Sequence, residues 1–331
     1  MLLVGGVVKR LFPVLIFLAG MHSHAALADL NSLGTDGWHT WQVRAVESAP
    51  EMCCFSWRSG ATTKKQCDLD GRNGGFGGSD DSATSDGSVQ VFALMESGAV
   101  TNIRVLSSSC PVTANSAIRD LGSIDTNDSV EWLETFITSD SKFGSNAIAA
   151  IAVHDGQRAR DILVDTAKSA DHEEAREDAI FWMGQARISE TATELRNLVF
   201  NDEDPDIREH AAFSYSQSSA SDAADVLIQQ GRTDDNPDVR SQAWFWLAQT
   251  EADNSEEAIR HALLNDKDED VREEAVFALS QLPGDRAVKA LAAVLEDRQL
   301  SMEIREQALF WLAQTESDEA FEYIDRLLSD N

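Results

Sequence analysis

Residues 239–249 read VRSQAWFWLAQ, and this arginine-led pattern occurs five times in the second half of the chain. The other copies read AREDAIFWMGQ at 175–185, IREHAAFSYSQ at 207–217, VREEAVFALSQ at 271–281 and IREQALFWLAQ at 304–314. The copies align without a gap, and their successive arginines are 32, 32, 32 and 33 residues apart. Self-similarity at a period of this length is typical of proteins built from stacked supersecondary units.

Each copy is predicted to form two helices joined by a short turn. In the first helix, an alanine three residues after the arginine and a leucine or close substitute seven residues after it lie on one apolar face. Asp204 and Asn236 each precede a proline. This order indicates an N-cap residue followed by a proline at the first helical position. The second helix has its own apolar column at Leu195, Leu227, Ile259, Leu291 and Ile324. One such pair cannot bury both stripes alone, so we expect neighbouring pairs to stack.

The pattern Asp-x-Asp-Val-Arg-x-x-Ala-x-x-x-Leu, found from Asp268 to Leu279, resembles the HEAT-like repeats first described in phycobilisome lyases. The resemblance covers about residues 127–331, and a degenerate sixth copy starts near Phe143, where Gly144 replaces the arginine. We therefore expect a mainly α fold in which residues 126–331 form an α-α superhelix of about six helix pairs. The resemblance is weak for activity, because such repeats serve lyases, hydroxylases and scaffolds alike.

The resemblance also implies a structural role for the arginine column. In such repeats the arginine pairs with an acid in a neighbouring inter-repeat loop, and the acids expected to do so here are Asp206, Asp238, Asp270 and Glu303. Partly buried pairs of this kind would tie one repeat to the next. The predicted structural ladder is Arg176, Arg208, Arg240, Arg272 and Arg305.

Phenylalanine occurs five residues after every one of these arginines, and glutamine follows four residues later. At about 100° per residue, both positions point away from the alanine and leucine stripe. The candidate partner-binding residues in these columns are Phe181, Phe213, Phe245, Phe277, Phe310, Gln217, Gln249 and Gln281. The favoured interpretation is that the rings fill gaps between adjacent repeats, since aromatic stripes at helical spacing are usually core. The alternative is an exposed aromatic ladder, which Trp182, Trp246 and Trp311 would widen.

Residues 29–125 show the alternation of strands rather than helical periodicity. Strands are predicted at 38–46, 88–94 and 100–106, and the turn around Ser97 and Gly98 makes the last two a hairpin. Residues 68–86 consist mostly of Asp, Gly, Ser and Asn, which favours an open loop. This segment is therefore predicted to be a small β-rich domain.

All four cysteines, Cys53, Cys54, Cys67 and Cys110, lie in this β-rich segment. An even number of cysteines in a small loop-rich domain is typical of disulfides formed in an oxidising compartment. We expect Cys53 and Cys54 to reach separately to Cys67 or Cys110, because a bridge between adjacent cysteines would be strained. A zinc site is the alternative, but no C-x-x-C spacing occurs and no histidine lies between Cys53 and Cys110.

Residues 1–28 are predicted to be a secretory signal. Lys9 and Arg10 form the basic region, an apolar run of eleven residues follows, and Ala26 and Ala28 are the small residues of a cleavage site. The apolar run is shorter than the ~20 residues needed to cross a bilayer. We expect a periplasmic or secreted protein with no membrane span after signal cleavage.

The chain of 331 residues has 27 lysines and arginines against 57 aspartates and glutamates, a formal charge of −30. Such a surface repels phosphate backbones, so we expect no nucleic-acid partner. The simplest interpretation is that the acids keep the chain soluble and cap its helices, with a cationic partner or Ca²⁺ as the alternative. The acids of the inter-repeat loops are Asp202, Glu203, Asp204, Asp234, Asp235, Asp266, Asp268, Glu269 and Asp270.

The sequence assigns no reaction. The best enzymatic candidate with such repeats is deoxyhypusine hydroxylase, whose repeats carry several His-Glu pairs for a di-iron centre, whereas His172-Glu173 is the only His-Glu pair here. We expect a non-catalytic exported scaffold that recognises another protein over the solenoid surface, without a metal or cofactor. The alternative is an enzyme, such as a cofactor-handling lyase or oxidoreductase of the same repeat family.

Overall fold

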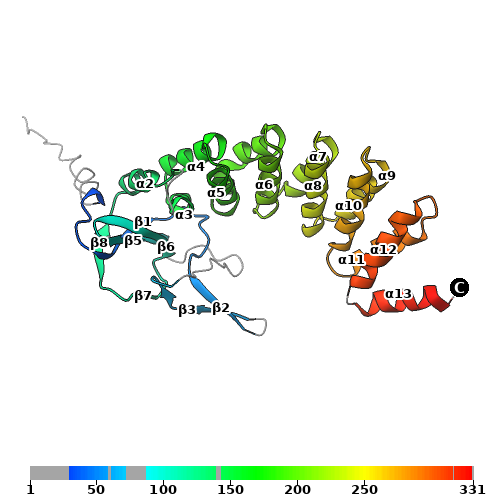
Figure 1. The fold of residues 1–331 in the computed structure, drawn as a ribbon, viewed down its shortest axis with the longest axis horizontal. Helices are drawn as coiled ribbons and strands as arrows, with labels where there is room; N and C mark the ends of the chain where they lie inside the picture. Colours follow the sequence, from blue (N-terminus) through cyan, green and yellow to red (C-terminus); the bar gives the residue numbers. More distant parts are fainter. Residues whose placement is uncertain (1–29, 59–60, 72–86, 139–142, 316, 330–331) are drawn as a thin grey trace, which may run out of the picture.

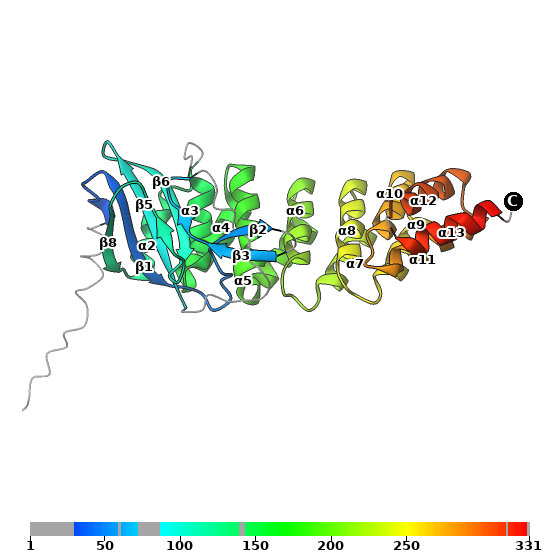
Figure 2. The same cartoon turned by 90° about the horizontal axis from the view of Figure 1, so that it is seen from below.

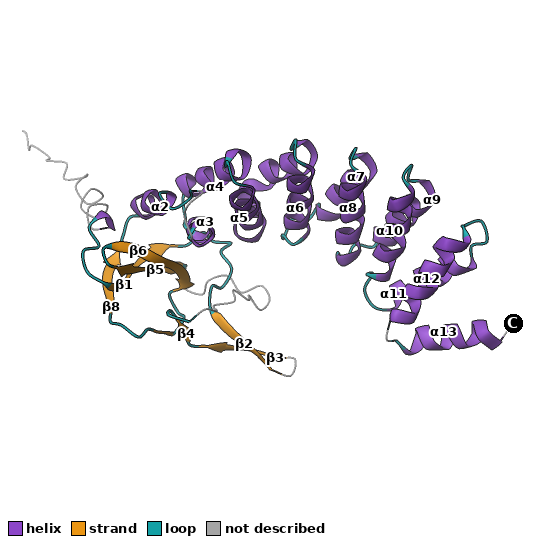
Figure 3. Cartoon of the chain, in the orientation of Figure 1, coloured by secondary structure: helices purple, strands orange, loops and turns teal. Residues whose placement is uncertain are grey.

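The computed structural model describes residues 30–58, 61–71, 87–138, 143–315 and 317–329. The predicted signal at 1–28 and most of the predicted loop at 68–86 lie outside the described residues. Strands occupy the N-terminal part and helices the remainder (Figure 3). The helices follow one another along an arch that leads away from the sheet (Figure 1). None of the described helices is both long and apolar enough to span a membrane.

The main sheet has the strand order β6-β5-β1-β8, in which β1 pairs antiparallel with β5 and parallel with β8. Its strands are β1 (Gly37–Arg44), β5 (Ser88–Glu96), β6 (Ala99–Ser107) and β8 (Ile118–Ser123). Strands β1, β5 and β6 correspond to the three that the alternation predicts. Ser97 and Gly98 form the β5–β6 turn with φ of 54° and 80°, as expected of a two-residue hairpin loop.

Two smaller pairs of strands extend this sheet region: β2 (Cys54–Arg58) with β3 (Ala61–Lys65), and β4 (Cys67–Asp68) with β7 (Val112–Thr113). Disulfides join Cys53 to Cys110 and Cys54 to Cys67. Each of the adjacent cysteines therefore has its own distant partner, as predicted. The bridges stabilise a small strand region chiefly by restricting its unfolded chain.

Where the structure describes the helical part, it contains six helix pairs, preceded by α2 (Thr126–Glu134). The helices are α3 (Gly144–Val153), α4 (Gln157–Ser169), α5 (Glu173–Asn201), α6 (Pro205–Ser216), α7 (Ala223–Thr233), α8 (Pro237–Gln249), α9 (Ser255–Asn265), α10 (Glu269–Ser280), α11 (Asp285–Glu296), α12 (Met302–Gln314) and α13 (Asp318–Ser329). Helix α5 is itself a pair, because its backbone leaves helical geometry at Arg187. We call the arginine-bearing helices (the first half of α5, α6, α8, α10 and α12) the first helices, and their partners the second helices.

The first helices begin where the sequence places their caps. The side chains of Asp204, Asn236 and Asp268 accept hydrogen bonds from the backbone N–H two residues later. Pro205 and Pro237 occupy the first helical position, where a missing N–H leaves no bond unmade. These caps fix the start of α6, α8 and α10 and thereby the register of the residues that follow them.

The apolar stripes of both helices are buried in the stack. The buried alanines of the first helices include Ala211, Ala243 and Ala275, and the leucines Leu247, Leu279 and Leu312 are buried with them. The second-helix column is buried too, with Leu195, Leu227, Ile259 and Leu291 all inaccessible to solvent. Only Ile324, in the last pair, is half-buried. The repeat register predicted from the arginine spacing is therefore confirmed.

Close packing between successive pairs requires a glycine in one helix. A Cβ on Gly231 of α7 would lie 2.5 Å from the Trp244 side chain of α8. Trp244 is buried, and its ring occupies the space that a larger residue at position 231 would need. The glycine thus permits a tryptophan at a position where the neighbouring repeats have smaller residues.

The sheet and the first helix pairs share one hydrophobic core, which contains Trp41 and Val91 of the sheet together with Ala147 and Ile151 of α3. Backbone hydrogen bonds cross the junction from Val46 N–H to the Val153 carbonyl and from Asp155 N–H to the Arg44 carbonyl, at 3.0 and 2.9 Å. The chain changes from strand to helix between β8 and α2. The division into domains at residue 125 stays a prediction, since the core runs across it.

A buried polar chain crosses the same junction. Trp41 Nε1 donates to Ser129 Oγ at 2.8 Å, and Ser129 Oγ lies 2.8 Å from His154 Nε2. His154 Nδ1 is 2.6 Å from the Ala150 carbonyl, which can only accept, so Nδ1 carries the hydrogen. Burial lowers the pKa of His154 to about 4, outweighing the opposing effect of the Ala150 bond, so the ring is neutral at pH 7. Arg187, also buried, donates to the carbonyls of Ala152 and His154.

Leu247→Ala is expected to destabilise the fold by about 2–5 kcal/mol, because it removes a fully buried side chain from the middle of the stack. Leu264→Ala on α9 is the matched control, since that leucine is 47% exposed. Thermal unfolding followed by circular dichroism measures both. Equal melting temperatures for the two variants would contradict the assigned register.

Candidate functional site

In the middle of the stack the first helices line the inner side of the arch. In Figure 1, α8 and α10 lie on the inner side and α7 and α9 on the outer side. Seen from below, α6, α8, α10 and α12 form a row that starts next to the sheet region (Figure 2). Because the alanine and leucine stripe packs toward the second helices, residues five positions after each arginine face the inner side.

Aromatic rings form an unbroken series along this inner side, which we call the aromatic ribbon. In spatial order its members are Trp182, Phe181, Phe213, Trp246, Phe245, Phe277, Trp311 and Phe310. Successive ring centroids are 4.6 to 6.5 Å apart, the range in which aromatic pairs attract each other. The rings come from all five first helices that carry the arginine, so the ribbon crosses every boundary between those repeats.

The ribbon is packed on one side and open on the other. Phe181, Phe213, Phe245 and Phe277 are half-buried, and Phe310 at the C-terminal end is 55% exposed. Phe213 and Phe277 each lean on a tryptophan of the next first helix, at 4.6 Å in both cases. Packing between repeats therefore describes the covered side of these rings, and exposure describes their open side.

Glutamines border the ribbon toward the C-terminal ends of the helices. Gln217 and Gln249 are exposed, and Gln281 is half-buried. The amide groups of Gln217 and Gln281 donate to the hydroxyl of the preceding serine, at 3.2 and 3.0 Å. These bonds hold two of the amides at the edge of the ribbon.

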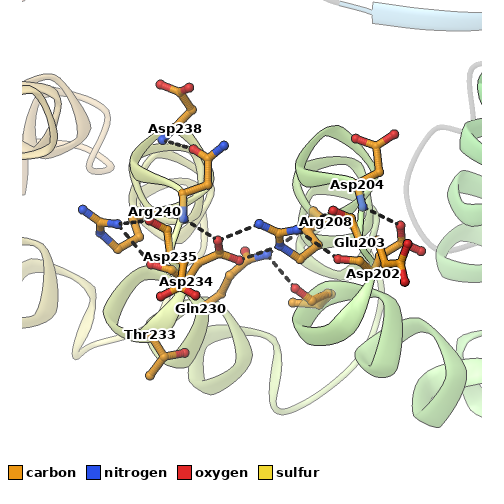
Figure 4. Close-up of polar contacts among 12 residues, drawn as sticks. Asp202, Glu203, Asp204, Arg208, Gln230, Thr233, Asp234, Asp235, Asp238 and Arg240 are labelled. Atoms are coloured by element: carbon orange, nitrogen blue, oxygen red, sulfur yellow. Dashed lines mark hydrogen bonds and ion pairs between the residues drawn. The ribbon is translucent and has the colours of Figure 1, made fainter.

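Three arginines of the predicted ladder connect consecutive inter-repeat loops. Arg176 pairs with Asp202 at 2.5 Å, Arg208 with Asp234 at 2.8 and 2.9 Å, and Arg240 with Asp266 at 3.0 and 2.8 Å. Arg208 and Arg240 also donate to the backbone carbonyl of the loop before their own helix, Asp202 and Asp234 respectively. Figure 4 shows Arg208 between the two loops that it joins, and Arg240 bonded to the loop before its own helix.

The acids that the sequence analysis assigned to this pairing are the wrong ones. Asp206, Asp238, Asp270 and Glu303 are exposed, and each lies two residues before an arginine on the same helix. Two residues back corresponds to about 160° around the helix, so these carboxylates point away from the arginine. The acids that do pair come 26 residues after their arginine, directly after a second helix.

Each pairing aspartate also orders its own loop. Asp234 Oδ1 accepts from the Asn236 N–H at 3.0 Å, and Asp266 Oδ1 accepts from the Asp268 N–H at 2.9 Å. Burial alone would raise the pKa of Asp266, but its hydrogen bonds with Arg240 and the Asp268 N–H outweigh burial and hold that pKa below its ordinary value. Hydrogen bonding to Asp266 in turn raises the pKa of Arg240.

The ladder stops after three rungs in the described residues. The position 26 residues after Arg272 is Arg298, which cannot serve as the acid. Arg272 keeps the bond to the preceding loop, at 2.8 Å to the Asp266 carbonyl. Arg305 Nε is buried and has no hydrogen-bond partner within the described part of the chain. In the described residues the last two arginine-bearing repeats therefore lack this ion pair. They are joined by apolar stacking and by the Gln307 amide, which donates to Glu273 at 2.9 Å.

No group of three or more His, Cys, Asp or Glu side chains in the described ranges is placed to hold a metal ion. His172 is exposed at the start of α5, beside an open cleft lined by residues that include Ser145, Glu174 and Asp178. Burial raises the pKa of Asp178, with a hydrogen bond from Ser145 opposing it. Residues of the degenerate copy and of the first regular one line this cleft.

The family model for HEAT repeats matches residues 163–243 and 224–302. Human deoxyhypusine hydroxylase is 17% identical, with a TM-score of 0.33 over 60% of this chain and 77% of that chain. The CpcE–CpcF complex of phycocyanin lyase from Nostoc sp. is 18% identical, with a TM-score of 0.29 over 60% and 94%. Yeast importin-β is 17% identical, with a TM-score of 0.33 over 56% and 30%.

No curated protein sequence matches the chain. The matched repeats and the stacked helix pairs make the helical part of the chain a HEAT-like repeat solenoid.

Arg240→Ala is expected to destabilise the fold by about 3–5 kcal/mol, because it leaves the Asp266 carboxylate buried without its partner. Arg158→Ala is the control, since its pair with Glu134 is 44% exposed on both sides and should contribute about 1 kcal/mol or less. Urea unfolding of both variants measures the difference. If Arg240→Ala lowers the free energy of unfolding no more than Arg158→Ala does, the ladder contributes little to stability.

The lowered pKa of Asp266 predicts a dependence of stability on pH. A carboxyl group whose folded pKa lies below its unfolded value stabilises the fold above that unfolded value, 3.8, and loses this contribution as pH falls through the folded pKa. Asp266→Asn should therefore be less stable than the wild type at pH 7, and the gap should narrow in acid. Unfolding free energies measured from pH 7 down to the acid transition test this, and a gap independent of pH would refute it.

Proposed function

We propose that this HEAT-like repeat protein is a non-catalytic scaffold that binds another protein along the inner side of its solenoid. The observation that supports this function is the aromatic ribbon, whose rings are continuous across five repeats and open on one side. Large aromatic side chains are the residues most enriched at the centres of protein interfaces. An extended concave surface is also the feature that stacked repeats offer to partners.

The composition of the ribbon favours a scaffold over a cofactor-handling lyase or oxidoreductase. Its members are hydrocarbon and indole rings, and such groups contact a partner without accepting or releasing protons at neutral pH. The formal charge of −30 favours a partner that is cationic. Phe181, Phe213, Phe245, Phe277 and Phe310, together with the three glutamines, are the proposed contact residues.

We also propose that the protein works outside the cytoplasm, in the periplasm or as a secreted protein. The two disulfides support an oxidising compartment, because such bonds are rare where thiols are kept reduced. The signal-like sequence of residues 1–28 supports the same location. In this proposal residues 29–125 form a disulfide-bearing β-rich domain, and residues 126–331 form the binding solenoid.

Phe245→Glu should abolish binding of the partner while the helical content stays unchanged, because it puts a charge in the middle of the ribbon. Loss of a central interface aromatic weakens binding by about 2 kcal/mol or more, roughly 30-fold. Phe310→Glu, at the exposed end of the ribbon, tests the same surface with less risk to folding. Phe321→Glu is the matched control, an exposed phenylalanine on α13 outside the ribbon.

Affinity capture from an envelope extract, read by mass spectrometry, measures these effects. The proposal predicts proteins that the wild type and the Phe321 variant retain and that both ribbon variants lose. Identical sets of captured proteins for all four baits would refute it.

A further inference from the structure

Two columns of carboxylates run beside the aromatic ribbon, and we call them the carboxylate margin. The first column lies two residues before the arginine, at about 160° around the helix from it. The second column lies one residue after the arginine, at about 100°. The phenylalanines lie between the two columns, at about 140°. The members of the margin are Glu174, Glu177, Asp206, Glu209, Asp238, Asp270, Glu273, Glu303 and Glu306, and Ser241 replaces the acid after Arg240. The margin therefore shares the inner side with the ribbon and follows it toward the helix starts.

The margin is not neutralised by the arginine ladder. The three rungs use Asp202, Asp234 and Asp266, which leaves Asp206 and Asp238 exposed on the inner side. Burial raises the pKa of Glu209, and the charges of Asp206 and Asp238 raise it further. The carboxylates of adjacent repeats are thus close enough to repel one another, and a cation placed between them would relieve that repulsion.

Arg208 is a cation beside the margin, where its charge lowers the pKa of Glu209, but its guanidinium is bonded to Asp234 and to the Asp202 carbonyl. Among the residues two, five, six and nine positions after the five ladder arginines there is neither lysine nor arginine. The inner side thus has three parallel zones on the first helices, which are carboxylates toward the helix starts, aromatic rings in the middle and glutamine amides toward the helix ends. This order is the same in each of the repeats from α6 to α12.

We propose that this surface binds an extended polypeptide segment rich in lysine and arginine, an inference that rests on the proposed function. The cationic groups of the segment would meet the carboxylate margin, and their aliphatic stems would lie across the rings. Amides of the glutamine zone both donate and accept hydrogen bonds, as a peptide backbone requires. A narrow ribbon that crosses five repeats fits a segment laid along it better than a compact domain.

The probe is a fluorescently labelled peptide in which lysine alternates with alanine, and the measurement is fluorescence anisotropy with the full chain. Two further peptides replace every lysine with glutamine or with glutamate. At low salt the lysine peptide should bind at least about tenfold more tightly than the glutamine peptide, and the glutamate peptide should not bind. The advantage should shrink as salt rises past about 0.1 M, where the screening length is near 10 Å.

Charge variants distinguish the margin from the general acidity of the chain. Asp206→Asn with Asp238→Asn removes two margin carboxylates, and should weaken lysine-peptide binding about tenfold. Asp225→Asn with Asp285→Asn is the matched control, because both are exposed aspartates in the first turn of second helices and the change in net charge is equal. This control should change the affinity less than twofold, within about 0.4 kcal/mol.

Equal binding of the lysine and glutamine peptides, or equal weakening by the two double variants, would overturn the proposal. These outcomes are separate from the fate of the scaffold function. If Phe245→Glu still loses a captured partner while the lysine peptide fails to discriminate, the ribbon binds a partner of other chemistry. If neither the partner nor the peptide depends on the ribbon, both proposals fail.

Discussion

The structure depends on one constraint, which is that no helix pair can hide its own apolar residues. The residue four positions after each arginine shows this directly. Ile180, Ala212, Trp244 and Val276 are buried in their repeats, because the next pair covers them. Leu309 occupies the same position in the last pair and is 41% exposed. Burial in this fold is therefore supplied by the neighbour, and each repeat owes its stability to the one beside it.

The polar features of the solenoid serve the same stacking. Arg208 donates to the loop before its own helix and to the loop after its own repeat. These two contacts fix the distance between neighbouring repeats. At the other end, the buried chain from Trp41 through Ser129 to His154 joins the sheet to the first helix pairs. Since stacking uses the alanine, leucine and arginine positions, the inner side is left for the aromatic ribbon and the carboxylates beside it.

The sequence predicts what repetition and capping determine, and it misses what depends on tertiary neighbours. The 32-residue spacing places the helix pairs. The adjacency of Cys53 and Cys54 leaves two possible disulfide patterns, and the structure has the one that joins Cys53 to Cys110 and Cys54 to Cys67. The acid partners of the arginines could not be chosen by proximity in sequence, since Asp202 lies 26 residues from Arg176. Helix periodicity offered the missing signal, because it places Asp206 on the side opposite Arg208.

Other features had no sequence signal. Strands β4 and β7 pair only two residues each. The two disulfides hold Cys67 of β4 and Cys110, just before β7, at the adjacent Cys54 and Cys53. The two halves of α5 meet at Arg187, where the backbone leaves helical geometry without forming a separate turn. The buried Arg187 guanidinium donates to the end of α3. Nothing near Arg187 in the sequence marks a turn. The partial burial of the phenylalanines depends on ring contacts between helices. Helix periodicity therefore identifies which residues form the column but does not predict how exposed they are.

Backbone hydrogen exchange read by mass spectrometry tests the central claim most directly. If neighbours supply the burial, amides of α6, α8 and α10, which are covered on both sides, should exchange slowest, and those of α12 and α13 should exchange first. Protection should therefore fall from the middle of the stack to its C-terminal end. Uniform protection along the repeats, or faster exchange in α8 than in α13, would contradict the account.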